Sequence, residues 1–423
     1  MKNFVLKGNL CYSEDSEHIH IVPQGYLVCE NGCSAGVFQT LPERYADLPL
    51  VDYGDRLIIP GITDLHVHAP QFAFRGLGMD MELLEWLNTY TFPEESKYAE
   101  ISYADRAYRQ FAEHLRASAT TRAVVFGTIH VPATTLLMEK LEAAGIVSYV
   151  GKVNMDRNSP EYLCEKDAQT SLEDTERWLC ETKERFAHTR PIITPRFIPS
   201  CSDALMQGLG RLAERHQVPV QSHLSENFGE IAWVGELCPD AEFYGQAYDR
   251  FGLFGGNVPC IMAHCVHSGA EEMELMRKNG VFVAHSPMSN ANLSSGVAPV
   301  SRYLAAGLRV GLASDIAGGD TENMFRVIAD AIRSSKLRWR LLDQETKPLS
   351  VDQAFYLATL GGGSFFGNVG SFEQGFAFDA LVLDDSKLDH PQELDVRARL
   401  ERCLYLADER QIAAKYVDGV RLF

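Results

Sequence analysis

Between residues 57 and 319, short apolar runs alternate with longer stretches whose apolar residues recur at helical spacing. Eight of the apolar runs are typical of buried strands: residues 57–68, 122–130, 146–156, 191–201, 218–227, 260–267, 281–290 and 309–319. Helical patterns lie between them, for example at residues 105–118 and 269–280. Eight strands that alternate with helices predict an α/β fold, in which a parallel sheet closes into a (β/α)8 TIM-like barrel.

The two ends of the chain carry a different pattern. Residues 3–12 and 25–38 alternate as the strands of hairpins do, and residues 378–385 and 413–423 have the same character. The simplest arrangement is one small β-sandwich domain built from both chain ends. The predicted domains are therefore residues 1–56 and 370–423, which form the sandwich, and residues 57–369, which form the barrel.

Polar side chains gather where the predicted strands end. His66 and His68 stand at the end of the first strand, and residues at i and i+2 of a strand point the same way. The fourth strand carries Arg196, and the last four strands also end in polar residues: His223, Glu226, His264, His267, His285 and Asp315. The carboxyl ends of barrel strands surround the active site, and five strands do not end this way through packing alone. The pattern predicts a metal site.

The ligand types indicate which metal the site would bind. Three imidazoles and one carboxylate, from His66, His68, His223 and Asp315, suit Zn²⁺, and Fe²⁺ accepts the same set. They leave one position for a water molecule, whose pKa the ion would lower toward about 7. A second ion would need a bridging lysine on the fourth strand, where this chain has Arg196, which stays protonated. One ion is therefore expected.

Composition excludes several classes of partner. The chain has 423 residues, 46% of them hydrophobic, a formal net charge of -18 and no basic run, which argues against nucleic acid and anionic membranes as partners. Its start lacks the apolar core of a signal peptide, and ten scattered cysteines without a C-x-x-C pair suit reduced thiols. We expect a cytoplasmic protein. The H-x-E and P-C-x-x-C signatures of the cytidine-type zinc deaminases do not occur.

Taken in order along the chain, these motifs resemble the amidohydrolase superfamily of metal-dependent hydrolases. PGITDLHVH, the histidines of strands five and six, and SD at strand eight carry the resemblance over about residues 50–380. Narrower motifs resemble the branch of this superfamily that deaminates guanine: HAPQ, PRFIPSC, SHLSEN, HSPMSNANLSSG and, above all, LLEWLNTYTFPEESKY at residues 83–98. The resemblance implies a hydrolase that converts guanine to xanthine and ammonia in purine catabolism.

The same resemblance implies a role for each site residue. It implies one Zn²⁺ per subunit held by His66, His68, His223 and Asp315, a proton shuttle and a water-holding group at Glu226 and His264, and guanine contacts from Gln71, Arg196 and Phe197. It also implies a homodimer. Proline at position 70 departs from the small polar residue expected there, and because Pro70 has no N–H, it offers no backbone donor to a substrate.

The residues themselves suggest how such a reaction would proceed. Asp315 can accept a proton from the attacking water, and Glu226, three residues after a ligand, can protonate the ring nitrogen beside C2 and then the leaving amine. Arg196 offers only donors, which match the acceptor O6 of guanine and leave the amino group of adenine unmatched.

Some alternatives stay open at this point. A related aminohydrolase acting on another heterocycle (8-oxoguanine, a pterin or a triazine) would keep the same metal and fold. A catalytically inactive scaffold relative would belong to another class of protein, and such relatives typically lose the ligands. The aromatic residues of segment 83–98 would form either a lid or an oligomer contact: Trp86, Tyr90 and Phe92. His267 and His285 are interpreted as supporting or structural residues.

Overall fold

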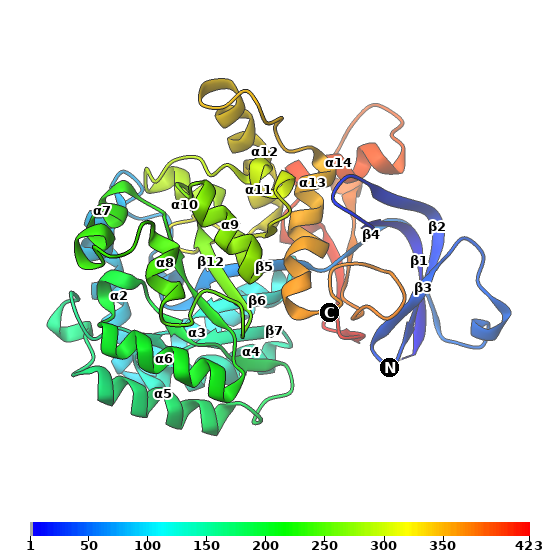
Figure 1. Ribbon diagram of the computed structural model, residues 1–423. Helices are drawn as coiled ribbons and strands as arrows, with labels where there is room; N and C mark the ends of the chain where they lie inside the picture. The colour runs from blue at the N-terminus through cyan, green and yellow to red at the C-terminus, as the bar shows by residue number, and fades with distance from the viewer. Residues whose placement is uncertain (1–2) are drawn as a thin grey trace.

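The computed structural model describes residues 3–423 and contains one seven-stranded sheet built from both ends of the chain, beside a larger body of parallel strands and helices (Figure 1). The strand order is β17-β16-β15-β4-β1-β2-β3. Their bounds are β1 Phe4–Ser13, β2 Ile19–Glu30, β3 Cys33–Phe38, β4 Leu50–Pro60, β15 Ala380–Leu383, β16 Ile412–Val417 and β17 Val420–Arg421. The joint contribution of both ends agrees with the sequence. The face-to-face packing of two sheets that defines a sandwich stays a prediction.

The body contains two four-stranded sheets in which all neighbouring strands are parallel. One has the order β5-β6-β7-β9 and the other β11-β12-β13-β14. Their bounds are β5 Ile62–His68, β6 Thr120–Phe126, β7 Val147–Gly151, β9 Thr189–Pro191, β11 Val220–Leu224, β12 Cys260–His264, β13 Phe282–His285 and β14 Arg309–Leu312. A short parallel pair, β8 Val153–Asn154 and β10 Thr194–Pro195, extends the carboxyl ends of the third and fourth runs.

Backbone contacts connect the two parallel sheets at both of their edges. Ile193 forms a parallel bridge to Val220, which links the β9 edge to β11. At the other edge the N–H of Asp315 donates to the carbonyl of His66 at 2.9 Å, and the N–H of His68 donates to Ile316 at 3.0 Å. This pairing is consistent with a TIM-like barrel and brings the carboxyl ends of the first and last strands together.

Helices lie between successive parallel strands and cover them (Figure 1). The predicted helices at 105–118 and 269–280 correspond to α3 and α9. The α-helices are α1 Leu83–Trp86, α2 Phe92–Ser96, α3 Ile101–Ala117, α4 Val131–Ala144, α5 Ala168–Thr182, α6 Asp203–His216, α7 Phe228–Leu237, α8 Tyr244–Asp249, α9 Ala270–Asn279, α10 Pro287–Asn292, α11 Val300–Ala305, α12 Met324–Leu341, α13 Val351–Tyr356 and α14 Val396–Leu406. The longer ones are amphipathic: α3 buries Tyr108, Phe111 and Leu115 on one face.

The apolar run at residues 57–68 forms two strands, so its prediction as one strand is wrong. Its first part belongs to β4 in the seven-stranded sheet, and its second part is β5 in the parallel body. Gly61 stands between them, where a Cβ atom would lie 2.2 Å from Oγ1 of Thr121. The pattern hides this change of sheet because both halves are fully buried. The run at 146–156 is likewise divided, into β7 and β8, at Lys152.

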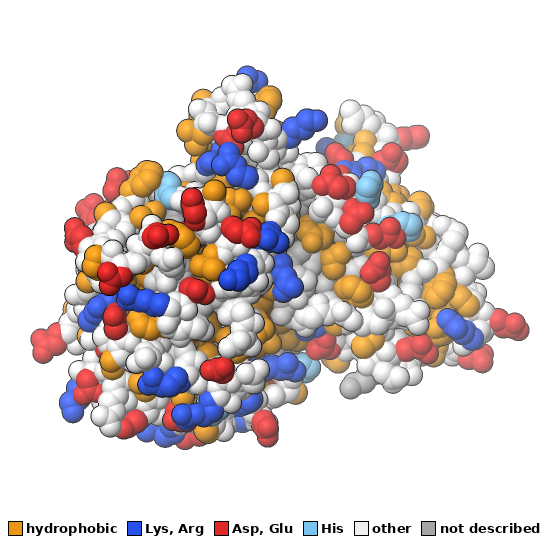
Figure 2. All heavy atoms as spheres, viewed as in Figure 1, with side chains coloured by type: hydrophobic (Ala, Val, Ile, Leu, Met, Phe, Trp, Pro, Cys, Tyr) orange, Lys and Arg blue, Asp and Glu red, His pale blue; other side chains and the backbone are white. Residues whose placement is uncertain are grey.

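The surface is mixed in charge. Figure 2 shows acidic and basic side chains interspersed over the visible face, with apolar side chains scattered between them. Among the helices of residues 3–423, none combines the length and the apolar character needed to span a membrane.

Candidate active site

His66 and His68 lie side by side at the carboxyl end of β5. All seven residues of this strand are buried, and the two rings project from the same face with their centroids 4.8 Å apart. Their Nε2 atoms are 3.1 Å apart. The i, i+2 spacing therefore places both rings at one point, as the sequence predicts.

Two further side chains reach this point from other strands. Nε2 of His223, on β11, lies 3.2 Å from Nε2 of His68. Asp315, just after β14, places Oδ1 at 3.1 Å from Nε2 of His66 and 3.4 Å from Nε2 of His68. The structure thus brings together all four side chains that the sequence predicts as ligands. His264 completes a second possible group of ligands with His66 and His223.

The donor chemistry of these side chains fits a metal cation. Nδ1 of His223 lies 2.6 Å from the carbonyl of Arg196 and donates to it, which leaves the Nε2 lone pair facing His68. Burial lowers the pKa of His66, His68 and His223 and keeps the rings neutral. Zn²⁺ binds imidazole nitrogens at about 2.0–2.1 Å, so neighbouring ligand atoms on one ion lie roughly 3–4 Å apart. The four separations given above, 3.1 to 3.4 Å, fall in this range.

The negative charge of Asp315 also suits a site for a metal cation. Burial opposes ionisation of this carboxyl, but its interactions with His66, His264 and His68 outweigh the effect and hold its pKa below the usual range. An anionic oxygen and neutral imidazole nitrogens therefore converge on one buried point, which is the environment that a divalent cation requires.

Asp64 supports this arrangement and was missed by the sequence analysis. It is fully buried on β5 and accepts hydrogen bonds from the backbone N–H of Ser314 at 3.0 Å and of His66 at 3.3 Å, and from the hydroxyl of Ser314. Burial raises its pKa to about 7. The position in TDLHVH gave no signal, because the partner strand is distant in the sequence.

Glu226 and His264 form the proton-transfer part of the site. Glu226 follows β11, is 3% exposed, and places Oε2 at 3.4 Å from Nε2 of His264. Its other oxygen accepts from the hydroxyl of Ser295 at 3.1 Å. Burial raises the pKa of Glu226 to about 7, with a smaller contribution from Glu230. A carboxyl that titrates near neutrality can both give and take a proton.

His264 is oriented by a neighbouring amide. Its Nδ1 lies 2.9 Å from Oδ1 of Asn290, so its Nε2 faces Glu226 and Asp315, the latter at 3.7 Å. Burial opposes protonation of this ring, but Glu226 and Asp315 outweigh it and raise its pKa.

A cavity opens directly beside these groups. It is lined by His68, Gln71, Leu83, Trp86, Leu87, Arg196, Phe197, His223, Glu226, Glu230, His264, Leu293, Asp315 and Gly318. The three predicted substrate contacts, Gln71, Arg196 and Phe197, therefore share one cavity with the candidate ligands. Apolar walls with a few converging polar groups are typical of a site for a small planar molecule.

Arg196 has a partner that the sequence analysis missed. Its Nη1 and Nη2 atoms donate to Oε2 and Oε1 of Glu95 at 2.6 and 3.1 Å, and Nε2 of Gln71 donates to the same carboxylate at 3.0 Å. Glu95 lies within the predicted segment 83–98, but helical periodicity could not place it. Pro93 and the wide π-turn at Leu87–Thr91 change the phase of the helix there.

The aromatic residues of this segment pack inward. Trp86 lines the cavity, and Phe92 is buried with its ring 5.1 Å from the guanidinium carbon of Arg196. Tyr90 is half-buried and stacks on Phe74. Trp86 and Phe92 therefore form part of the wall of the site.

Two further histidines of the predicted strand ends, His267 and His285, lie outside the four-ligand set. Nε2 of His267 lies 2.8 Å from the carbonyl of Ser295, and its ring stacks on Phe228 at 4.0 Å. His285 is buried, and burial lowers its pKa to about 3, so its ring is neutral.

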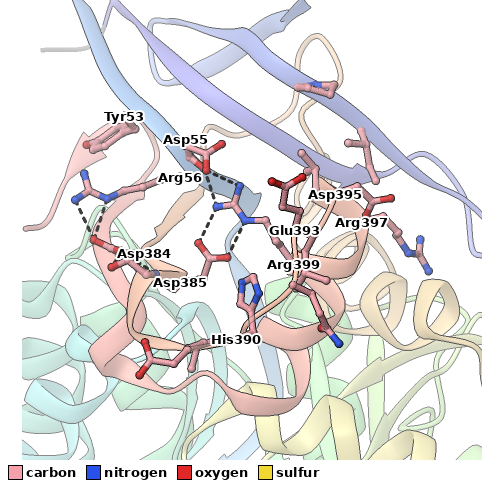
Figure 3. A pocket seen from close by; sticks show the side chains of 18 residues that line it. Tyr53, Asp55, Arg56, Asp384, Asp385, His390, Glu393, Asp395, Arg397 and Arg399 are labelled. Carbon is pink, nitrogen blue, oxygen red and sulfur yellow. Dashed lines mark hydrogen bonds and ion pairs between the residues drawn. The ribbon is translucent and has the colours of Figure 1, made fainter.

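A larger surface hollow lies elsewhere, between the seven-stranded sheet and residues 384–399 (Figure 3). Its guanidinium groups already have partners: Arg56 binds Asp384, and Arg399 binds Asp55 and Asp385. The guanidinium group of Arg397, which also lines the hollow, binds Asp352 and Glu401. No metal-ligand group within residues 3–423 falls in this hollow. The chemistry is therefore concentrated at the strand ends.

Comparisons with known proteins agree with this geometry. Residues 57–422 match the sequence profile of the amidohydrolase family. The guanine deaminase of Dictyostelium discoideum is 34% identical, with 99% of this chain and 98% of that protein covered. The Escherichia coli enzyme of the same name is 36% identical over 87% of this chain and 83% of its own length. The crystal structure of guanine deaminase from C. acetobutylicum with guanine in its active site superposes with a TM-score of 0.97 at 48% identity, and each chain is fully covered.

Proposed function

This chain belongs to the amidohydrolase family, and we propose that it catalyses the hydrolytic deamination of guanine to xanthine and ammonia. The observation that carries the proposal is the meeting of three parts in one buried cavity. These parts are the group of metal-binding side chains, the carboxyl of Glu226, and the donor pair Arg196 and Gln71. Relatives named guanine deaminase that align over nearly the whole chain support this substrate over other heterocycles, and the complete ligand set argues against an inactive scaffold.

We infer that eight parallel strands form a TIM-like barrel within residues 57–369, flanked by a small β domain from residues 1–56 and 370–423. One Zn²⁺ per subunit, held by His66, His68, His223 and Asp315, fits the site; Fe²⁺ has the same ligand preferences. When bound, the ion would supply a water molecule acidic enough to act as a nucleophile at neutral pH. A cytoplasmic location and a homodimer are what the resemblance implies, and both stay predictions.

The roles of the proton-carrying residues follow from their contacts. Asp315, held ionised, accepts a proton from the attacking water. Glu226 delivers a proton to N3, the ring nitrogen beside C2 that carries no hydrogen in guanine. His264, between Glu226 and Asp315, orients the water. The water oxygen bonds to C2 and becomes the new carbonyl oxygen, and the C2–N bond breaks. One of the two water protons leaves with the amine as ammonia, and the other makes up for the proton that Glu226 gave to N3, so Glu226 is protonated again at the end of the cycle.

Arg196 recognises the substrate through its hydrogen-bond donors. Two of the five N–H groups of Arg196 bind Glu95, and the others are free to meet O6 of guanine. Adenine presents an amino donor at the corresponding position, which would leave a buried arginine unmatched. Phe197 and Trp86 supply apolar walls for the flat base.

The experiment that tests this function is ammonia release from guanine by the zinc-loaded protein, with Glu226→Gln as the matched variant. Release by the wild type and its loss in the variant support the proposal. No release by the wild type contradicts the proposed substrate, and equal release by both proteins contradicts the role of Glu226.

A further inference from the structure

We propose that Glu95 is a positioning residue for substrate recognition, which holds Arg196 and Gln71 in the orientation that reads the O6 edge of the purine. This inference rests on the proposed function and assigns a role to a residue outside the cavity wall. Glu95 is 1% exposed and does not line the cavity, whereas both of its partners do. It therefore acts on the substrate only through them.

The contacts of Glu95 use both carboxylate oxygens. Oε2 accepts from Nη1 of Arg196 at 2.6 Å, and Oε1 accepts from Nη2 of Arg196 at 3.1 Å and from Nε2 of Gln71 at 3.0 Å. A bidentate pair between carboxylate and guanidinium fixes the plane of the guanidinium as well as its position. One buried carboxylate thus sets the direction of two side chains that come from different strand ends.

The same network determines which way the amide of Gln71 points. Its oxygen accepts the backbone N–H of Ala317 at 3.1 Å, and its nitrogen donates to Glu95. A carboxylate can only accept and an N–H can only donate, so the opposite orientation would lose both hydrogen bonds. One N–H of Gln71 stays available to a ligand in the cavity.

The N–H donors of Arg196 that do not bind Glu95 match the acceptors of guanine. Arg196 gives two of its five N–H groups to Glu95, and within residues 3–423 no other acceptor binds it. Guanine presents the acceptors O6 and N7 along one edge, which is the edge that an arginine recognises, whereas adenine presents a donor in place of O6. With two of its N–H groups bound to Glu95, Arg196 presents its remaining N–H donors to that edge of the base.

Charge and packing favour the same role. Arg196 is 3% exposed, and a buried guanidinium without a counter-charge is strongly unfavourable, so Glu95 keeps the arginine in place. Phe92, in the same short helix α2, packs against the guanidinium at 5.1 Å. The segment after the π-turn therefore contacts Arg196 through both an aromatic face and a carboxylate.

The test compares two bases that differ at C6. Guanine and 2-aminopurine carry the same 2-amino group, but 2-aminopurine has no O6. In Glu95→Gln, an amide nitrogen replaces one acceptor oxygen and faces the donors of Arg196 or Gln71. We expect kcat/KM for guanine to fall at least about 100-fold, while kcat/KM for 2-aminopurine changes less than about threefold.

Glu94→Gln is the matched control. Glu94 is the preceding residue of α2 and binds Lys97 and Tyr103 instead of the site, so this variant should keep the wild-type ratio between the two bases. If Glu95→Gln does not fold, Glu95→Asp keeps the charge and shortens the side chain, and it should lower the guanine to 2-aminopurine ratio at least about fivefold.

The outcomes separate the two proposals. Equal losses on both bases, or an unchanged ratio in a folded variant, contradict the role of Glu95 while the wild-type activity on guanine stands. A wild-type protein that does not deaminate guanine contradicts the proposed function itself. Addition of Glu95→Gln to a variant that already carries Arg196→Ala and Gln71→Ala should cause less than a threefold further loss on guanine, because Glu95 acts through these two side chains. A full additional loss contradicts this inference.

Discussion

Asp315 contacts His66 through both its backbone and its side chain. Its N–H donates to the carbonyl of His66 at 2.9 Å, and its Oδ1 lies 3.1 Å from Nε2 of the same residue. The first contact aligns the ends of β5 and β14, and the second brings two candidate metal ligands together. Asp64 adds a third connection between these strands through the backbone N–H of Ser314. Strand pairing therefore fixes the relative positions of these ligands. No flexible loop has to become ordered when a metal binds.

The metal should be essential and should depend on the β5 histidines. Chelation is expected to abolish guanine deamination, and added Zn²⁺ should restore it. His68→Ala removes one imidazole from a four-ligand set, so its metal content after dialysis should fall at least about tenfold, measured by elemental analysis. His390→Ala, which changes an exposed histidine, is the control. Full metal content in His68→Ala contradicts the assigned ligand set.

Arg196→Ala tests recognition of O6. This variant removes the buried N–H donors that face O6, and kcat/KM for guanine should fall by about 10³-fold or more. Sites built to hydrogen-bond a polar group of the substrate lose activity on that scale when the hydrogen bond cannot form. Thermal unfolding must confirm that the variant folds, since Glu95 loses its counter-charge. Arg211→Ala, on the exposed face of α6, should match the wild type. A loss of tenfold or less would exclude the arginine from recognition.

The raised pKa of Glu226 predicts a pH-dependent stability difference in the metal-free protein. A glutamate titrates near 4.5 when unfolded, and burial raises the pKa of Glu226 in the fold to about 7. The folded state thus keeps a proton that the unfolded state releases, and stability is lost as pH rises from about 4.5 through 7.

Glu226→Gln removes this titration. Its free energy of unfolding should therefore increase relative to wild type as pH rises from 5 to 8, by on the order of 3 kcal/mol. Urea denaturation of both proteins at several pH values measures the difference. A difference that does not change with pH would show that the carboxyl titrates in the fold as it does in the unfolded chain.

Gly61 should tolerate no side chain. A Cβ atom there would lie 2.2 Å from Oγ1 of Thr121, at the point where the chain passes from β4 to β5. Gly61→Ala is expected to reduce the free energy of unfolding by about 1–3 kcal/mol through overpacking. Gly235→Ala, in α7 with open space around it, should be neutral or slightly stabilising. Equal behaviour of the two variants would contradict the close approach at Gly61.

The sequence predicts the features that depend on residues close together in the chain. Strand periodicity places His66 and His68 on one face, and the alternation of strands and helices predicts that the strand ends converge. The comparisons confirm the family that the motifs indicate. Features that depend on contacts between distant segments could not be found in this way. Asp64 depends on Ser314, and Glu95 depends on Arg196, each across a large part of the chain.

The helix phase explains why Glu95 in particular was missed. A π-turn at Leu87–Thr91 and Pro93 rotate the following turn, so regular spacing from α1 gives no reliable direction for residue 95. The division of residues 57–68 into two strands was hidden for a different reason. Residues 57–60 of β4 and the whole of β5 are buried, so hydrophobicity does not change at Gly61, where the chain leaves one sheet and enters the next.

The most direct measurement is a comparison of kcat/KM for ammonia release from guanine, 8-oxoguanine, adenine, isoxanthopterin and a triazine by the zinc-loaded protein. The site described here predicts that guanine is the preferred substrate. Adenine should be at least about 10³-fold poorer, because it has neither an O6 acceptor for Arg196 nor an amino group at C2. Preference for another heterocycle, or no ammonia from any of them, would contradict the assignment of this site to guanine deamination.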